Sequence, residues 1–171
     1  KRQIIYNMWR CKVKGEKAMS MIDVKTALND NIGVDLIAIN QYFFHARVLK
    51  HWGYEKLGSL IYKRSIEVMR FSDDLIQRLF LLEGLPNLQR LGKLLVGENV
   101  LEVLACDLVL EHKMHTLLIE GISICDQNTD FVSRKILTKH LAANEAHINV
   151  VKENEKLVEV MGKSNYLELL I

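Results

Sequence analysis

The stretch Tyr62-Lys-Arg-Ser-Ile-Glu-Val-Met-Arg-Phe-Ser-Asp73 predicts the middle of a long helix. It contains no Gly or Pro, and its large apolar residues recur three to four positions apart, as they do along one face of a helix. They form two stripes, one of Ile61, Val68, Phe71 and Leu75 and one of Tyr62, Ile66 and Met69. The stripes are turned from each other by roughly 100°. One face suits the core of a helical bundle, and the other predicts a partner chain or a bound apolar ligand.

The composition of the whole chain favours a single all-helical domain. The chain has 171 residues, 49% of them hydrophobic, and only one proline. This length is enough for a substantial core. No segment has the apolar length of a membrane span or of a signal-peptide core. The three cysteines, Cys11, Cys106 and Cys125, are odd in number and lack metal-type spacing. Cys106 and Cys125 lie among apolar residues, so we expect them to be small core residues in a reducing cytoplasm.

Charge divides the chain into a basic start and a mildly acidic body. Residues 1–20 carry six Lys or Arg and one Glu, a net charge of +5, whereas the remainder has 17 basic and 20 acidic residues. We expect residues 1–20 to be a poorly ordered basic extension. A translated upstream segment and a weak nucleic-acid or membrane contact are the alternatives. The acidic balance of residues 21–171 argues against nucleic acid as a ligand and is compatible with cations.

Four long helices and a short fifth are predicted from Met21 onward, at about residues 21–51, 54–82, 100–127, 130–161 and 165–170. The segment Glu83–Gly97, between the second and third helices, holds the only proline and three of the nine glycines. A connection of this length is uncommon inside a compact domain. We expect it to cross the length of the bundle, so that the second and third helices run parallel.

Polar residues interrupt the apolar stripes of three helices. Asp35 and Glu111 do so on the first and third helices, and His147 does so on the fourth, beside His140 and Asn144. A buried carboxylate is costly unless it is paired or bound to a cation. Carboxylate oxygens with an imidazole suit iron or manganese, so these residues indicate a metal site. Alternatively, each of them finds a hydrogen-bonding neighbour.

Several segments carry a resemblance to a known family. They are Leu36-Ile-Ala-Ile-Asn-Gln-Tyr-Phe-Phe-His-Ala-Arg47, Trp52-Gly53, Leu81-Leu-Glu-Gly-Leu-Pro-Asn-Leu-Gln89, Leu91-Gly-Lys-Leu94 and Phe131-Val-Ser-Arg134. In order and spacing these segments closely resemble bacterioferritins, over about residues 20–171. The resemblance implies a ferritin-like four-helix bundle with a long crossover between helices two and three and a short C-terminal fifth helix. It also implies a hollow shell of twenty-four subunits that stores ferric mineral, with residues 21–171 as the ferritin-like domain.

The resemblance further implies haem b held between two subunits. The family's axial ligand is a methionine on the second helix, one from each subunit across a two-fold axis, and Met69 matches that position. A thioether is a soft ligand that raises the reduction potential of haem. The positions that match the family's pocket lining are Leu36, Ile39, Asn40, Phe43, Tyr62, Ile66 and Ser72. The alternative is that Met69 is ordinary interface packing, because methionine commonly fills gaps.

The family's iron-oxidising site is only partly matched. It uses one glutamate from each of the first and third helices and a Glu-x-x-His pair from each of the second and fourth. The matching positions here are Asp35, Glu111, Val68 with Phe71, and Asn144 with His147, so three of the six ligands are missing. The two remaining carboxylates balance one divalent ion at most. We therefore expect only weak residual metal binding by Asp35, Glu111 and His147, with His140 as a possible addition, and packing by Val68 and Phe71.

The resulting hypothesis is an iron-storage subunit that binds haem, supports reductive iron release and lacks a complete ferroxidase centre. Such a chain would be inactive alone in the oxidation of ferrous iron by O₂. Its expected partners are a second copy across the haem, a ferroxidase-competent bacterioferritin subunit in a mixed shell, and a ferredoxin as electron donor, with no nucleic acid and no membrane. Two alternatives stay open: an active ferroxidase with unconventional ligands, and a haem electron-transfer or sensor dimer outside iron storage.

Overall fold

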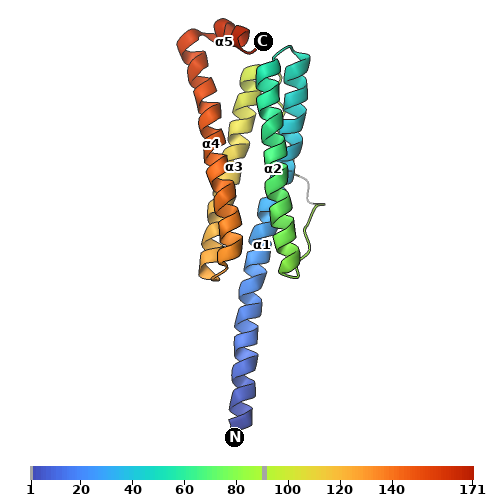
Figure 1. Ribbon diagram of the computed structural model, residues 1–171, viewed down its shortest axis with the longest axis vertical. Coiled ribbons are helices and arrows are strands. Elements are labelled where there is room, and N and C mark those ends of the chain that lie inside the picture. Colours follow the sequence, from blue (N-terminus) through green and yellow to red (C-terminus); the bar gives the residue numbers. More distant parts are fainter. Residues whose placement is uncertain (1, 90–91) are drawn as a thin grey trace.

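The computed structural model describes the backbone of residues 2–89 and 92–171 and the side chains of residues 23–89 and 92–171. Within these ranges it contains helices and no strands (Figure 1). The helices are α1 (Arg2–His51), α2 (Glu55–Leu81), α3 (Val100–Gln127), α4 (Phe131–Met161) and α5 (Lys163–Leu169). The prediction of an all-α bundle with a short C-terminal helix is confirmed. α1 begins at Arg2 rather than near Met21. The side chains of residues 1–20 lie outside the described ranges, and the prediction that these residues form a poorly ordered extension stays a prediction.

The bundle is built from two helix pairs joined by the long crossover. α1 packs mainly on α2, and α3 packs mainly on α4. The segment between α2 and α3 runs back along the bundle, so that both helices point the same way, as expected (Figure 1). α3 starts at the N-cap Asn99, whose side chain accepts from the backbone N–H groups of Leu101 and Glu102. This satisfies two N–H groups that a helix start otherwise leaves unpaired.

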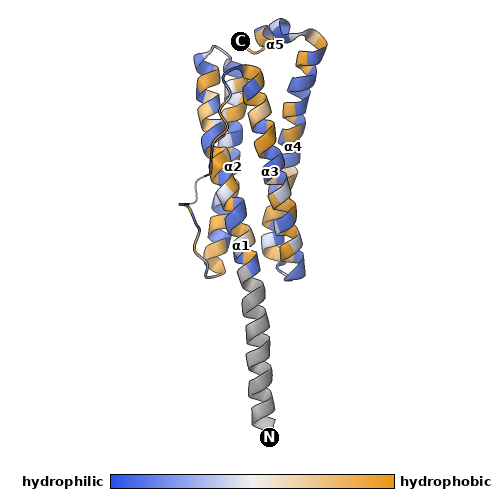
Figure 2. Cartoon of the chain, turned by 180° about the vertical axis from the view of Figure 1, so that it is seen from behind, coloured by the Kyte–Doolittle hydropathy of each residue, from blue (hydrophilic) through white to orange (hydrophobic). Residues whose placement is uncertain are grey.

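The buried side chains form two apolar clusters, and a set of buried polar residues interrupts them. One cluster includes Tyr42, Ile61 and Val68, and the other includes Leu75 and Leu137. Hydrophobic and hydrophilic residues alternate along the helices of the bundle, as amphipathic helices require (Figure 2). Ser72, His140 and Asn144 lie between the clusters along their helices, whereas Asp35, Arg64 and Glu111 lie within the span of the first cluster. We call these six buried polar residues the polar layer. No helix within the described residues has the length and apolar character needed to span a bilayer.

Candidate functional site

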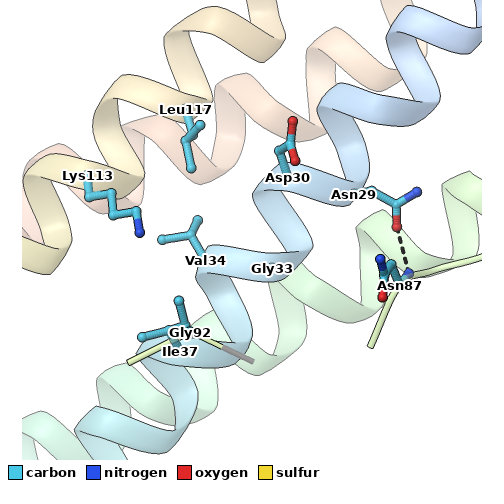
Figure 3. Close-up of a pocket in the computed structure, with 9 residues that line it drawn as sticks. All are labelled: Asn29, Asp30, Gly33, Val34, Ile37, Asn87, Gly92, Lys113 and Leu117. Atoms are coloured by element: carbon cyan, nitrogen blue, oxygen red, sulfur yellow. Dashed lines mark hydrogen bonds between the residues drawn. The ribbon is translucent and has the colours of Figure 1, made fainter. Parts of the chain in front are cut away.

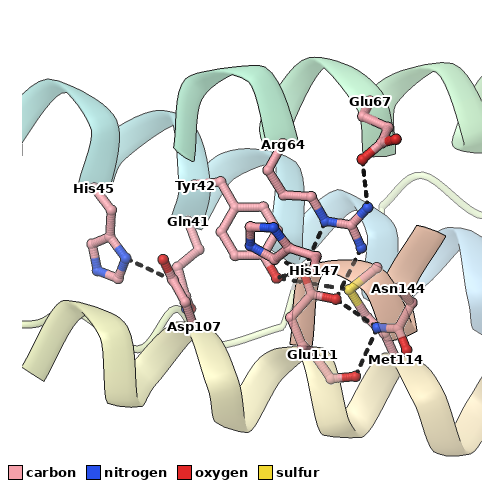
Figure 4. A network of polar contacts seen from close by, with 10 residues as sticks. All are labelled: Gln41, Tyr42, His45, Arg64, Glu67, Asp107, Glu111, Met114, Asn144 and His147. Carbon is pink, nitrogen blue, oxygen red and sulfur yellow. Dashed lines mark hydrogen bonds and ion pairs between the residues drawn. The ribbon is translucent and has the colours of Figure 1, made fainter. Parts of the chain in front are cut away.

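The carboxylate of Glu111 on α3 is the centre of the polar layer (Figure 4). Its side chain is fully buried. Tyr42 Oη donates to Oε1 at 2.7 Å, and Arg64 donates from Nε to Oε1 at 2.8 Å and from Nη2 to Oε2 at 2.9 Å. Asn144 Nδ2 adds a fourth hydrogen bond to Oε2 at 2.5 Å. Each oxygen therefore accepts two hydrogen bonds, and the Arg64 guanidinium balances the charge of the carboxylate.

Arg64 lies on the core-facing side of α2, with only 3% of its surface exposed. Its Nη1 also donates to Glu67 Oε2 at 2.8 Å. Burial lowers the pKa of Arg64, but the hydrogen bonds and charge of Glu111 outweigh it and hold the pKa above the ordinary value. Arg64 is thus a permanent internal cation. This role was not predicted from the sequence. Its signal is the position of Arg64, four residues before Val68 and seven before Phe71, on the same helix face.

Val68 and Phe71 occupy the core, as the sequence predicts. Val68 is fully buried, and Phe71 is 6% exposed. The Phe71 ring stacks on the imidazole of His140, with ring centroids 4.4 Å apart and planes 13° apart. At these two positions the interior of α2 is therefore filled by apolar packing.

Asp35 and His140 form a second buried pair in the polar layer. His140 Nε2 lies 3.7 Å from Asp35 Oδ1, beyond hydrogen-bonding distance. Within the described residues, neither Asp35 oxygen and neither His140 nitrogen has a hydrogen-bond partner. Burial raises the pKa of Asp35 well above its usual range, although the charge of Arg64 opposes this. Burial also lowers the pKa of His140 to about 3, so the imidazole is neutral at physiological pH.

The three residues predicted to retain a metal ion fall into separate pairs. His147 Nε2 lies 3.7 Å from Glu111 Oε1, whereas Asp35 faces His140. Burial lowers the pKa of His147, so its ring is mainly neutral at pH 7. No group of three His, Cys, Asp or Glu side chains in the described ranges is arranged to hold a metal ion. Metal binding by Asp35, Glu111 and His147 stays a prediction, and an ion at Glu111 has to compete with Arg64.

The neutral His140 predicts an acid-sensitive fold. A histidine with a depressed folded-state pKa contributes stability that is present above the unfolded-state pKa, near 6.5, and is lost as pH falls. Between pH 6.5 and 5 we expect the free energy of unfolding to drop by about 2 kcal/mol more in the wild type than in His140→Gln. Asp35 acts in the opposite sense, since its raised pKa favours the folded state as pH falls, but it acts in both proteins. Urea unfolding at a series of pH values measures the difference.

The control for His140→Gln is His112→Gln, because His112 is an exposed histidine on α3. This control should follow the wild-type pH dependence. If His140→Gln also follows it, the neutral buried imidazole is not the source of the acid sensitivity.

A second polar network, of Gln41, His45 and Asp107 (Figure 4), ties the crossover to the bundle. His45 Nδ1 lies 2.8 Å from Asp107 Oδ1, and Gln41 Nε2 donates to the same oxygen at 2.9 Å. The backbone N–H of Gly97 donates to His45 Nε2 at 3.2 Å, and that of Leu95 donates to Gln41 Oε1 at 2.9 Å. Because Nε2 accepts, the proton of neutral His45 lies on Nδ1 and is donated to Asp107. These contacts fix the path by which the chain returns to the start of α3.

The second apolar stripe of α2 lies on the surface beside α1. Met69 is 47% exposed, and Phe43 is exposed to the same extent. The rings of Phe43 and Tyr62 lie 6.4 Å apart, and the Arg47 guanidinium lies 5.1 Å from each centroid. Of the other predicted lining residues, Leu36, Ile39, Tyr62 and Ile66 are half-buried, Asn40 is exposed, and Ser72 is buried. Tyr62, Ile66 and Met69 share one face of α2, and Phe43 of α1 contacts Tyr62, so we call these four residues the Met69 face. Ser72 is buried, and the grouping of the whole predicted set around Met69 stays a prediction.

A pocket of about 450 Å³ lies elsewhere, between α1, α3 and the crossover (Figure 3). The side chain of Asn29 on its wall accepts a hydrogen bond of 2.8 Å from the backbone N–H of Asn87. Asp30 and Lys113 are its ionisable lining residues. None of the predicted site residues lines this pocket, so the candidate functional site is the polar layer together with the Met69 face.

Comparison with known proteins relates the bundle to one family. Residues 25–159 match the model of the ferritin-like domain. The chain is 39% identical over 142 residues to the bacterioferritin of Brucella melitensis, which covers 83% of this chain and 88% of the relative. It is 36% identical over 144 residues to the bacterioferritin of Streptomyces coelicolor, covering 84% and 86%. It is 37% identical over 142 residues to a bacterial ferritin of Pseudomonas aeruginosa, covering 82% and 92%.

Proposed function

Because this chain belongs to the bacterioferritins, within the ferritin-like proteins, we propose that it is an iron-storage subunit that carries haem and lacks a ferroxidase centre of its own. The observation that supports the second part best is the bidentate pair of Arg64 and Glu111. The first part rests on the family and on the exposed Met69 face. The subunit would store iron, its cargo, without oxidising it.

Charge explains why the polar layer is unsuited to two ferrous ions. The ions bring a charge of +4, whereas the layer offers Asp35 and Glu111. Glu111 is already balanced by Arg64, and burial favours the neutral form of Asp35. At the two positions of α2 where the family has its Glu-x-x-His pair, this chain has the buried apolar residues Val68 and Phe71. A di-iron centre would therefore have to displace an internal guanidinium and open a packed core.

The residues of the Met69 face fit a haem. A haem is flat and mostly apolar, and the face offers an exposed thioether beside the aromatic rings of Phe43 and Tyr62. Met69 would be the axial ligand, and the half-buried Leu36, Ile39 and Ile66 would exclude water. When bound, haem supplies one-electron transfer. In this subunit that chemistry would serve the reduction and release of stored ferric iron.

The proposed assembly is a two-fold dimer across the haem within a cytoplasmic shell of twenty-four subunits. One exposed apolar face cannot serve every contact of such a shell. Large apolar side chains are also exposed at Leu81, Val109, Phe131 and Val132, which supports further subunit contacts. A ferroxidase-competent subunit would oxidise the incoming iron, and a ferredoxin would supply electrons to the haem. Size-exclusion chromatography with detection of haem absorbance separates this shell from a free haem dimer.

The purified homopolymer should show no rapid, saturating oxidation of two ferrous ions per subunit, as measured by stopped-flow absorbance. The variant Val68→Glu/Phe71→His/Asn144→Glu restores the missing ligand types but leaves Arg64 on Glu111, so we expect little gain. Adding Arg64→Gln should free Glu111 and return rapid oxidation. Fast oxidation at two ions per subunit by the wild type would contradict the proposal and support an active ferroxidase with unconventional ligands.

A further inference from the structure

A hollow of about 390 Å³ lies between α2 and α4, directly beside the Met69 stripe. Its lining includes Tyr62 and Ile66, which belong to the stripe, and also Lys63 and Arg70. At 100° per residue, Ile66, Arg70 and Lys63 lie roughly 60°, 100° and 120° from Met69 around the helix, all in the same direction. Both cations therefore flank one side of the apolar face.

Lys63 and Arg70 bring two positive charges to the lining of the hollow. Both are exposed, and neither makes an ion pair or a side-chain hydrogen bond within the described ranges. The neighbouring carboxylates are engaged: Glu67 accepts from Arg64 at 2.8 Å, and Asp73 accepts from Gln77 at 2.8 Å. His147, across the hollow on α4, is mainly neutral. The lining holds three cations, Lys63, Arg64 and Arg70, against the single carboxylate of Glu67, and Arg64 also balances Glu111. The hollow therefore keeps a net positive charge next to an apolar surface.

Haem has the complementary chemistry. Its macrocycle is apolar, and two carboxylates leave from one edge. If Met69 of two subunits binds one iron on a two-fold axis, symmetry gives each subunit the same surroundings and therefore one carboxylate. We propose, building on the haem site of the proposed function, that Lys63 and Arg70 of each subunit bind one carboxylate of the shared haem. Charge-assisted hydrogen bonds of this kind are the stronger class, and they would fix which edge of the haem faces the hollow.

The test uses two ligands that differ only in charge: haemin, and haemin dimethyl ester, in which both carboxylates are esterified. The full-length assembled protein is freed of haem and titrated with each ligand, and binding is followed by the visible spectrum. The variants are Arg70→Gln, Lys63→Gln and the double variant. The matched control is Lys113→Gln, because Lys113 is an exposed lysine on α3, away from the Met69 face.

We expect each variant to weaken haemin binding about 10-fold, as for one charge-assisted hydrogen bond. The ester should bind to all proteins equally, with an unchanged thioether-ligated spectrum, and Lys113→Gln should match the wild type. Equal haemin affinity in all proteins would overturn the proposal while leaving the proposed haem site intact. The proposal would also be overturned if the variants lost affinity for the ester by the same factor as for haemin. If the wild type binds neither ligand, the proposed haem function fails as well.

Inorganic phosphate is the competing anion for the same two cations. A phosphate titration of the haem-free protein, followed by calorimetry, tests it. If the variants lose phosphate binding but keep wild-type haemin affinity, the hollow is a free-phosphate site and the proposal is overturned.

Discussion

Replacing Arg64 with alanine is expected to lower the free energy of unfolding by about 3–5 kcal/mol. The side chain of Glu111 is fully buried, and Arg64 is its closest cation, so the substitution leaves a buried carboxylate without a counter-charge. Tyr42 and Asn144 still donate hydrogen bonds, but they carry no charge. Chemical denaturation of the full chain at neutral pH measures the loss.

A surface ion pair of the same type provides the control for Arg64→Ala. Arg134 Nε lies 3.2 Å from Asp126 Oδ1, and both side chains are about half exposed. Arg134→Ala should therefore cost less than about 1 kcal/mol. The double variant Arg64→Met/Glu111→Gln removes both charges and should recover most of the stability. If Arg64→Ala costs no more than Arg134→Ala, the buried pair does not stabilise this fold.

Met69→Leu is expected to abolish thioether ligation of haem while leaving the fold intact. Leucine keeps a similar apolar size but has no lone pair to offer to iron. Because Met69 is half exposed and lies outside the two core clusters, its loss should change the free energy of unfolding by less than about 0.5 kcal/mol. Haemin titration followed by visible spectroscopy measures the first effect, and denaturation measures the second.

Met161→Leu is the matched control, since Met161 packs against the core at the end of α4, away from the Met69 face. It should bind haemin like the wild type. An unchanged haem spectrum in Met69→Leu would instead mean that Met69 does not ligate the haem iron and only packs in an interface.

The helices and the crossover could be predicted from the sequence because their signals are local. Apolar periodicity placed α2 and α3 within one residue of their observed bounds. The length of the segment between them predicted a crossover that runs back along the bundle. The start of α1 was not predicted, because α1 begins at Arg2 whereas the sequence placed its start near Met21. Local signals thus decide where helices run but fix their ends less well.

The contents of the polar layer were predicted only in part, because they depend on pairing between distant helices. The sequence predicted that Val68 and Phe71 pack in the core instead of binding metal, and the structure buries both. It did not show that Arg64 reaches Glu111, 47 positions away. It also did not show that His140 faces Asp35 rather than Glu111. Which buried charge meets which partner is set by the approach of whole helices, for which one chain's spacing gives no signal.

The Arg64 guanidinium has a consequence for when this subunit can fold. Small domains that are held together by a structural metal ion need that metal in order to fold, and removing it with a chelator unfolds them. Here the compensating cation is part of the polypeptide, so it arrives with synthesis and cannot be withdrawn. The stability of such a subunit would therefore be the same whether the cell is poor or rich in iron, and the subunit could fold before any iron is bound.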